Sequence, residues 1–273
     1  MSTQRAPRES LSSMLGIQQR GPRVYGAALE SFWGATTPGD LLARATLATT
    51  AERREAPTAH QALFFSAPPP DVELSFACEA VGAGRERVTV HHGDARVCEV
   101  VVRYGSDEPG INYQSTRPPA GVPSPDDLPS EREVAASEGW EPYAVGPIES
   151  RRISAYAPVA SDEPSVWVGW LRPREELPDE LGLQAGARAF SSEYRSHWAI
   201  ERRLGSDFPS TELTLLDHSL WVHHAIPWND WWLVTTRSDV GARGRCLSRR
   251  EIFARDGTLI ASAIWEARAR AHS

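Results

Sequence analysis

The sequence predicts an α+β fold of two tandem units, each with one helix and an antiparallel sheet, and the two sheets joined into one continuous sheet. Three observations predict it. The 273 residues provide two units of about 135 residues, each large enough to bury a core. A proline-rich segment divides the chain near its middle. On both sides of it, one helical pattern is followed by a series of strand patterns separated by turns.

The N-terminal half begins with a polar tail, residues 1–20, whose short apolar stretch predicts a loosely docked helix. Apolar side chains at helical spacing predict a helix over residues 24–33, and Thr-Thr-Pro-Gly at 36–39 predicts its end. Strands are predicted at residues 60–65, 72–80, 87–91 and 96–104, with prolines or glycines between them. These elements form a first unit over residues 21–105.

A linker over residues 106–147 separates the two units. Its central part carries Pro118, Pro119, Pro123, Pro125 and Pro129. Proline lacks an N–H group and fixes its backbone angle, so this density excludes a helix and a central strand. We therefore expect an extended connector.

The second unit, residues 148–273, repeats the order of the first. A helix is predicted at residues 184–200, and strands at 212–224, 231–237, 244–254 and 258–269. Apolar and polar residues alternate along 258–265, which indicates a strand with one buried face.

Local matches between the halves indicate an internal duplication. The glycine turn at 81–85 matches 240–245, the turn at 93–94 matches 256–257, His60 matches His218, and Glu30 matches Glu193. Each match is offset by about 160 residues, in the same order. One helix wrapped by an antiparallel sheet, present twice, describes the double hotdog fold. Joining the two sheets also removes two exposed sheet edges.

Composition excludes several functions. The chain contains no lysine, so Schiff-base, PLP-anchoring and P-loop lysine chemistry are impossible. A net charge of −7 argues against a nucleic-acid partner. We expect no membrane span, because no apolar run approaches the roughly 18 residues needed. Residues 1–10 lack the apolar region of a signal peptide, so we expect the cytosol. Cys78, Cys98 and Cys246 lack CxxC spacing, which argues against a disulfide framework or a zinc site.

Four motifs in the second half carry a resemblance to a known family. They are LDHSLWVH at 216–223, WNDWWL at 228–233, ARGR at 242–245 and DGTLIAS at 256–262. Together they resemble the C-terminal half of the acyl-CoA thioesterase II family, and LPSE at 128–131 resembles its interdomain segment. The resemblance is strong over 217–262 and weak over 148–213. It implies a double hotdog that hydrolyses acyl-CoA thioesters without a cofactor, and further association into a homo-oligomer.

The resemblance also implies a catalytic triad that this chain has altered. Family members use an acid on the second helix, a Thr or Ser two residues before the motif Asp, and a Gln on the last strand, to activate a water. These positions map to Glu193, with Ser192 as an alternative, and to Leu215 and Trp265. Leu and Trp can neither accept a proton from water nor polarise a carbonyl as an amide does. Thr214 precedes Leu215 but would face the other side of a strand.

Glu193 and His60 are the catalytic candidates. A carboxylate on a central helix should be partly desolvated, which raises its pKa toward the range of a general base. The alternative is a surface Glu193 paired with Arg188 or Arg195. In hotdog dehydratases a His and an acid work together, so His60 could act with Glu193; otherwise it only hydrogen-bonds a turn.

Further residues are candidates for lining an acyl pocket or for structural roles. Leu215, Trp221, His223 and Trp265 are the substrate-binding candidates, with sheet packing as the alternative for the tryptophans. Strand alternation places Asp217, His218, His223 and His224 two to a face, so we predict no metal site. Asp217 and Ser219 are expected to tie their strand to neighbouring backbone.

Three functions remain open at this point. The first is hydrolysis of an acyl thioester of coenzyme A or of a carrier protein, with Glu193 positioning water. The second is a dehydratase, isomerase or cyclase of a secondary-metabolite pathway that uses Glu193 with His60. The third is a non-catalytic acyl-binding or scaffold protein whose site is filled by Leu215 and Trp265.

Overall fold

A computed structural model describes residues 10–28, 37–51, 53–69, 71–106, 108–138, 147–153 and 166–271. In the N-terminal half these residues form α1 (Leu11–Met14), β1 (Gln18–Gly21), β2 (Val24–Ala28), α2 (Pro38–Thr50), β3 (Pro57–Phe64), β4 (Glu73–Gly82), β5 (Arg85–His92) and β6 (Ala95–Tyr104). The connector carries η1 (Pro125–Asp127) and α3 (Glu131–Glu138).

The C-terminal half contributes a second helix-and-sheet unit. Its elements are β7 (Ile148–Arg152), β8 (Val166–Pro173), α4 (Leu181–Glu193), α5 (Trp198–Leu204), η2 (Gly205–Ser210), β9 (Thr211–Leu215), β10 (Asp217–Val222), β11 (Trp232–Ala242), β12 (Arg245–Phe253) and β13 (Leu259–Ala271). Each of the eight strand patterns read from the sequence is therefore a strand or a pair of strands. Strand β1 starts inside the predicted tail.

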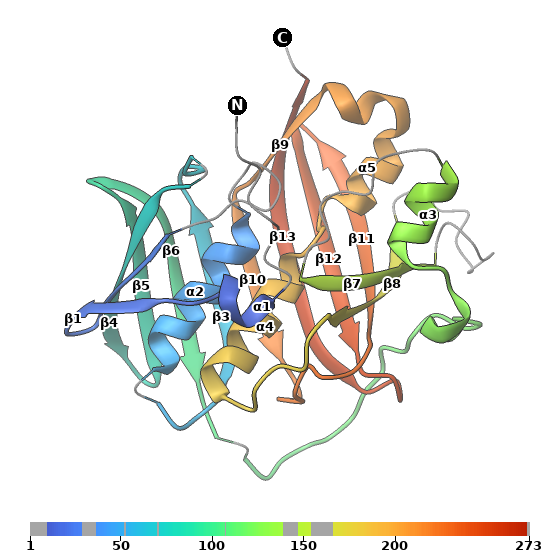
Figure 1. Cartoon of the computed structure of the whole chain (residues 1–273). Coiled ribbons are helices and arrows are strands. Elements are labelled where there is room, and N and C mark those ends of the chain that lie inside the picture. Colours follow the sequence, from blue (N-terminus) through green and yellow to red (C-terminus); the bar gives the residue numbers. More distant parts are fainter. Residues whose placement is uncertain are drawn as a thin grey trace.

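The strands of both halves form one continuous sheet. Its order is β1-β2-β4-β5-β6-β3-β10-β13-β12-β11-β8-β7, with β9 paired to β13. The sheet curves around α2 and α4, which lie side by side (Figure 1). The halves meet where β3 pairs antiparallel with β10, so that His60 lies opposite Leu220 and His218 opposite Ala62. The predicted double hotdog with one continuous sheet is confirmed.

The prediction of a helix at residues 24–33 is wrong over residues 24–28, and residues 29–33 lie outside the described residues. Residues 24–28 are strand β2, paired with β4 from Val24 opposite Ala77 to Ala28 opposite Glu73. The central helix of this half is α2. Thr37 Oγ1 accepts a hydrogen bond from the Asp40 N–H (3.2 Å), and the Thr37 N–H donates to the Asp40 carboxylate (3.3 Å). Pro38 suits the first helical turn, where its missing N–H is not needed.

The sequence Thr-Pro-Gly at 37–39 therefore starts a helix instead of ending one. This also changes the match between the halves, because α2 and not residues 24–33 is the counterpart of α4. Glu30, the expected partner of Glu193 in the repeat, lies outside the described residues. The second predicted helix, 184–200, is divided into α4 and α5 by a turn in which Arg195 has a φ of 52°.

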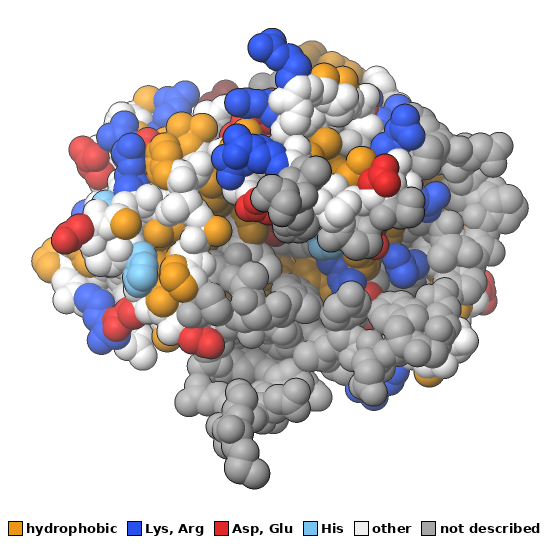
Figure 2. All heavy atoms as spheres, turned by 90° about the horizontal axis from the view of Figure 1, so that it is seen from above, with side chains coloured by type: hydrophobic (Ala, Val, Ile, Leu, Met, Phe, Trp, Pro, Cys, Tyr) orange, Lys and Arg blue, Asp and Glu red, His pale blue; other side chains and the backbone are white. Residues whose placement is uncertain are grey.

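Two apolar cores lie between the sheet and the paired helices. The second core is larger and rich in tryptophan, with Trp167, Trp198, Trp228, Trp232 and Trp265 buried together. A separate small cluster packs α5 against the sheet through Ile200, Cys246 and Ala267. Over the face seen in Figure 2, basic and acidic side chains lie close to one another. Among the described residues, no helix is long and apolar enough to cross a membrane.

Candidate active site

Glu193 is the last residue of α4 and lies at the junction of the two central helices. Its side chain is buried, with the residue 8% exposed. Oε1 accepts a hydrogen bond from Ser196 Oγ (2.8 Å) and Oε2 accepts one from the Gly39 N–H (3.0 Å). Gly39 belongs to the first turn of α2, where free N–H groups carry partial positive charge. The carboxylate therefore bridges the end of one helix and the start of the other.

The close approach of the helices depends on glycine at position 39. A Cβ added there would lie 3.0 Å from Glu193 Oε2 and 3.3 Å from the Phe190 carbonyl oxygen. Because both distances are shorter than ordinary contacts, a larger residue would displace the Glu193 carboxylate from the Gly39 N–H. The position of the Glu193 carboxylate therefore depends on residues of both α2 and α4.

Burial raises the pKa of Glu193 to about 7. Hydrogen bonds from Ser196 and Gly39 and the positive charge of Arg250 lower this pKa, but burial has the larger effect. A pKa near neutrality suits a general base, because the group is then partly ionised and can accept a proton. The alternative of a surface Glu193 paired with arginine is wrong. Arg195 forms an ion pair with Glu131 (2.8 Å), and Arg188 donates to the Ile226 carbonyl (3.1 Å).

Arg250 lies beside Glu193 and was missed by the sequence reading. It is fully buried on β12. Its Nη1 donates to the Ser191 and Tyr194 carbonyls (2.8 and 2.9 Å), so the guanidinium caps the C-terminal end of α4. Its Nη2 has no hydrogen-bond partner among the described residues. Strand alternation could have revealed this arginine, because it shares a face with the core residue Ile252.

Trp265 occupies the position that maps to the family glutamine. It is 1% exposed. Its ring stacks on His218 with centroids 5.9 Å apart, and the Arg250 guanidinium lies 5.6 Å from its centroid. Leu215, at the position of the family hydroxyl, packs against the core cluster that contains Trp265. Both mapped positions are therefore part of a packed apolar wall.

His60 is hydrogen-bonded to His218 rather than to Glu193. His60 Nε2 lies 3.1 Å from His218 Nδ1, and His218 Nε2 lies 3.4 Å from Ser192 Oγ. Burial lowers the pKa of His60 to about 3 and that of His218 well below its ordinary value. Both rings are thus neutral near pH 7, and one donates to the other. The pair sits where β3 meets β10, on the same side of the sheet as the helices.

Two of the predicted substrate-binding residues lie elsewhere. Trp221 faces the other side of β10 from His218 and Leu220, away from the helices. His223 is exposed, and its Nε2 lies 2.9 Å from Ser262 Oγ. The structure therefore brings together Glu193, Trp265 and Arg250, but not Trp221 or His223.

The Asp217 side chain has the structural role expected of it. Its Oδ1 accepts a hydrogen bond from the Glu266 N–H (3.1 Å), which ties the start of β10 to β13. Within the described residues, no group of three His, Cys, Asp or Glu side chains is placed to hold a metal ion.

Comparison with known proteins identifies related sequences. Residues 125–268 match the family model of the acyl-CoA thioesterase C-terminal domain. A relative in Haemophilus influenzae, acyl-CoA thioesterase 2, is 26% identical over 177 residues. That match covers 61% of this chain and 61% of the relative's length.

Solved structures share the fold at low identity. An acyl-CoA thioesterase II, TesB2, from Mycobacterium marinum superposes with a TM-score of 0.80 at 20% identity, covering 97% of this chain and 99% of that one. A tesB protein from Mycobacterium avium subsp. paratuberculosis gives 0.75 at 20% identity, covering 95% and 98%. The dehydratase domain of PpsC from Mycobacterium tuberculosis, in complex with C12:1-CoA, gives 0.54 at 11% identity, covering 93% and 97%.

Proposed function

The chain belongs to the family defined by the acyl-CoA thioesterase C-terminal domain, and from this premise we propose that it is a cytosolic enzyme that hydrolyses acyl-CoA thioesters. The observation that carries the proposal is the buried Glu193 carboxylate, whose pKa is about 7, held at the junction of α2 and α4. It stands where the resemblance places the family's catalytic acid.

In the proposed reaction, Glu193 acts as the general base. Its carboxylate accepts a proton from a water molecule while the water oxygen bonds to the thioester carbonyl carbon. The carbon–sulfur bond then breaks, and the proton passes to the leaving thiolate. One water and one acyl-CoA thus give one carboxylic acid and one coenzyme A thiol.

We further propose that the site has changed around this base. Leu215 and Trp265 supply no group that orients water, so the wall they form would shape the acyl pocket instead. The positive charge that remains nearby is Arg250, whose Nη2 is buried without a partner among the described residues. A positive charge close to the reacting carbonyl would stabilise the oxyanion that forms during attack.

The dehydratase alternative is less well supported. It needs His60 to exchange a proton with the substrate beside Glu193. His60 instead hydrogen-bonds His218 inside the sheet junction, and burial lowers its pKa to about 3, which makes it a weak base. The thioesterase structures also superpose better than the dehydratase domains do.

The proposal is tested by thiol release from a series of straight-chain and branched acyl-CoAs. We expect turnover of at least part of the series by the wild type. In Glu193→Gln, kcat should fall about 100-fold or more, the usual contribution of a general base. Glu212→Gln on β9 changes an exposed carboxylate and should leave the rate unchanged.

Two outcomes would contradict the proposal. One is the absence of thiol release from every acyl-CoA while the wild-type protein is folded by circular dichroism; saturable acyl-CoA binding in that case would favour the non-catalytic acyl-binding function. The other is an equal rate for wild type and Glu193→Gln, which would place the chemistry elsewhere.

A further inference from the structure

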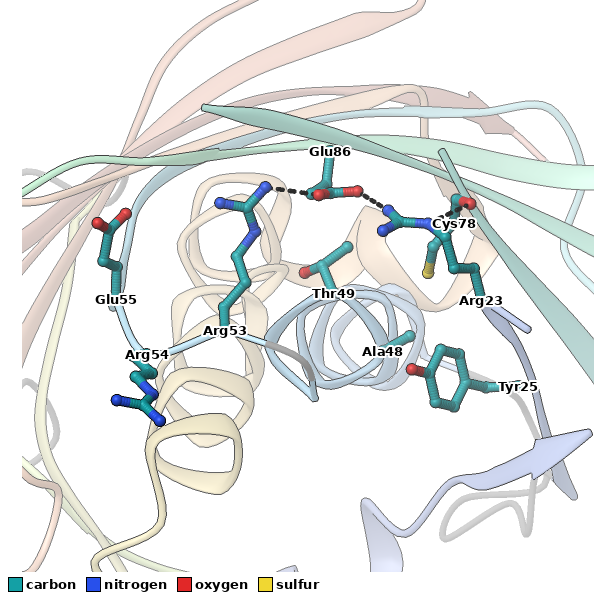
Figure 3. Close-up of a pocket in the computed structure, with 9 residues that line it drawn as sticks. All are labelled: Arg23, Tyr25, Ala48, Thr49, Arg53, Arg54, Glu55, Cys78 and Glu86. Carbon is teal, nitrogen blue, oxygen red and sulfur yellow. Dashed lines mark hydrogen bonds and ion pairs between the residues drawn. The ribbon is translucent and has the colours of Figure 1, made fainter. Parts of the chain in front are cut away.

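A cavity lies in the first half of the molecule, at the C-terminal end of α2 (Figure 3). Its volume is about 320 Å³, at the lower end of the range for small-molecule sites. Tyr25, Ala48 and Thr49 line one side of it. Gly39, which holds Glu193, lies at the other end of the same helix. At about 1.5 Å per residue, Thr49 is roughly 15 Å from Gly39.

The carboxylate of Glu86 is buried in the wall of this cavity. The Glu86 side chain is 4% exposed, and two arginines approach it from opposite sides (Figure 3). Arg53 Nη2 donates to Oε1 (2.5 Å), and Arg23 Nη2 donates to Oε2. Glu86 therefore accepts from both guanidinium groups, and Arg23 Nε also donates to the Cys78 carbonyl (3.2 Å).

Arg53 keeps hydrogen-bond donors for another group. Within the described residues, its guanidinium hydrogen-bonds Glu86 and stacks over the Tyr104 ring at 4.3 Å. One edge of the planar fork is thus committed to a carboxylate, while the remaining N–H groups have no protein acceptor there. An arginine fork binds carboxylates and phosphates edge-on, so these groups suit an incoming oxyanion.

The second half shows that the fold does not require this charged cavity. Glu86 follows Arg85 in β5 as Cys246 follows Arg245 in β12, directly after the matched hairpins. Cys246 is buried against Ile200 of α5, so α5 fills the equivalent place with apolar groups. In the first half, β3 follows shortly after α2, so no helix fills the equivalent position and the cavity remains there. Buried charges are costly to retain without a partner or a ligand.

We propose that this cavity binds an oxyanion, the carboxylate or phosphate group of a small molecule, on the guanidinium group of Arg53. Arg54, which is exposed and also lines the cavity, adds a further positive charge at the rim, opposed by Glu55. Two sources offer this chemistry: a free metabolite, or the phosphate groups of coenzyme A. The site is separate from Glu193, so it does not depend on hydrolysis.

Isothermal titration calorimetry with inorganic phosphate and with succinate, at constant ionic strength, tests the proposal. We expect saturable binding of at least one of the two to the wild type. Arg53→Gln should weaken it about tenfold or more, the value of a lost charged hydrogen bond. Glu86→Gln should strengthen the binding, because the Arg53 guanidinium loses the carboxylate that competes with the anion.

Arg87→Gln is the matched control. Arg87 neighbours Glu86 on β5 but pairs with Glu79 and Glu99 at the surface, so its loss should leave the affinity unchanged. Equal affinity of wild type and Arg53→Gln, or no saturable heat with either anion, would overturn the proposal. Circular dichroism verifies folding of each variant. Competition by coenzyme A would identify its phosphates as the source, and lack of competition would identify a free metabolite.

Discussion

Glu193 shows how a single buried carboxylate links activity to stability. Its pKa in the folded protein is about 7, against an ordinary value of 4.5. Between these values the folded state holds more protons than the unfolded state, so stability falls as pH rises through this range and stays low above it. The same ionisation creates the form that can accept a proton from water. Activity and stability therefore depend on pH in opposite directions.

We predict that kcat/KM falls about tenfold per pH unit below pH 7. Glu193→Gln, although its kcat is reduced about 100-fold or more, should be more stable than the wild type by about 1–3 kcal/mol at pH 8. This difference in stability should disappear at pH 4, where Glu193 is protonated in both the folded and the unfolded state. Urea unfolding at the two pH values measures it. Glu212→Gln should match the wild type at both, and an equal stability of Glu193→Gln and wild type at pH 8 would refute the argument.

The residues of the site were only partly readable from the sequence. Glu193 could be found because the family resemblance maps the catalytic acid onto the predicted second helix. Arg250 could not be found by resemblance, because it belongs to none of the mapped positions, although its place on the buried face of β12 was readable from the alternation. The His60–His218 contact depends on the register between β3 and β10, which no local pattern specifies.

At the scale of elements, the two central helices are the structural basis of the site. They pack closely because small residues face each other. A Cβ at Gly186 would lie 3.0 Å from Leu47 Cγ and 3.1 Å from the Ala43 carbonyl oxygen. The backbone oxygen cannot give way as a flexible side chain can, so the helices would have to separate. Separation would also break the bond from the Gly39 N–H to Glu193.

We therefore predict that Gly186→Val destabilises the protein by about 2 kcal/mol or more, through overpacking. Urea unfolding at pH 7 measures the effect. Gly21→Val on β1 is the control, because a Cβ there meets nothing within 4 Å, and its effect should stay within about 1 kcal/mol. A Gly186→Val variant as stable as the wild type would mean that the helices are not in close contact.

The helices also show where sequence patterns mislead. Residues 24–33 carry apolar residues at helical spacing, but residues 24–28 pair with β4 and become a strand, because tertiary pairing overrides local propensity. The true helix begins at Thr-Pro-Gly, which reads as a stop if capping is ignored. The eight predicted strand segments are all found, because each has one buried face and turns at its ends, whereas β1, β2, β7 and β8 were missed.

At the scale of the whole molecule, the β3–β10 pair joins the two sheets into one, and its buried side carries His60 and His218. All tryptophans except Trp33 lie after residue 139, so fluorescence reports on the second half, whereas far-UV circular dichroism reports on both. A single sheet with paired helices should unfold as one unit, so the two signals should change together.

Acid should unfold this molecule through its buried histidines. Burial lowers the pKa of His60 to about 3, that of His197 to about 4, and that of His218 well below 6.5. Below pH 6.5 the unfolded state therefore binds more protons, and stability is lost progressively as pH falls toward 3. Glu193 works in the opposite direction between 4.5 and 7, and so do Asp40 and Asp217, because burial raises their pKa values above 3.8. Burial also lowers the pKa of His223, which adds to the effect of the other three histidines. We predict that the free energy of unfolding decreases from pH 6.5 to pH 4, and that His60→Gln reduces the slope by about one proton. His224→Gln, at an exposed site, should keep the wild-type slope. Equal slopes for His60→Gln and wild type would show that the junction does not control acid unfolding.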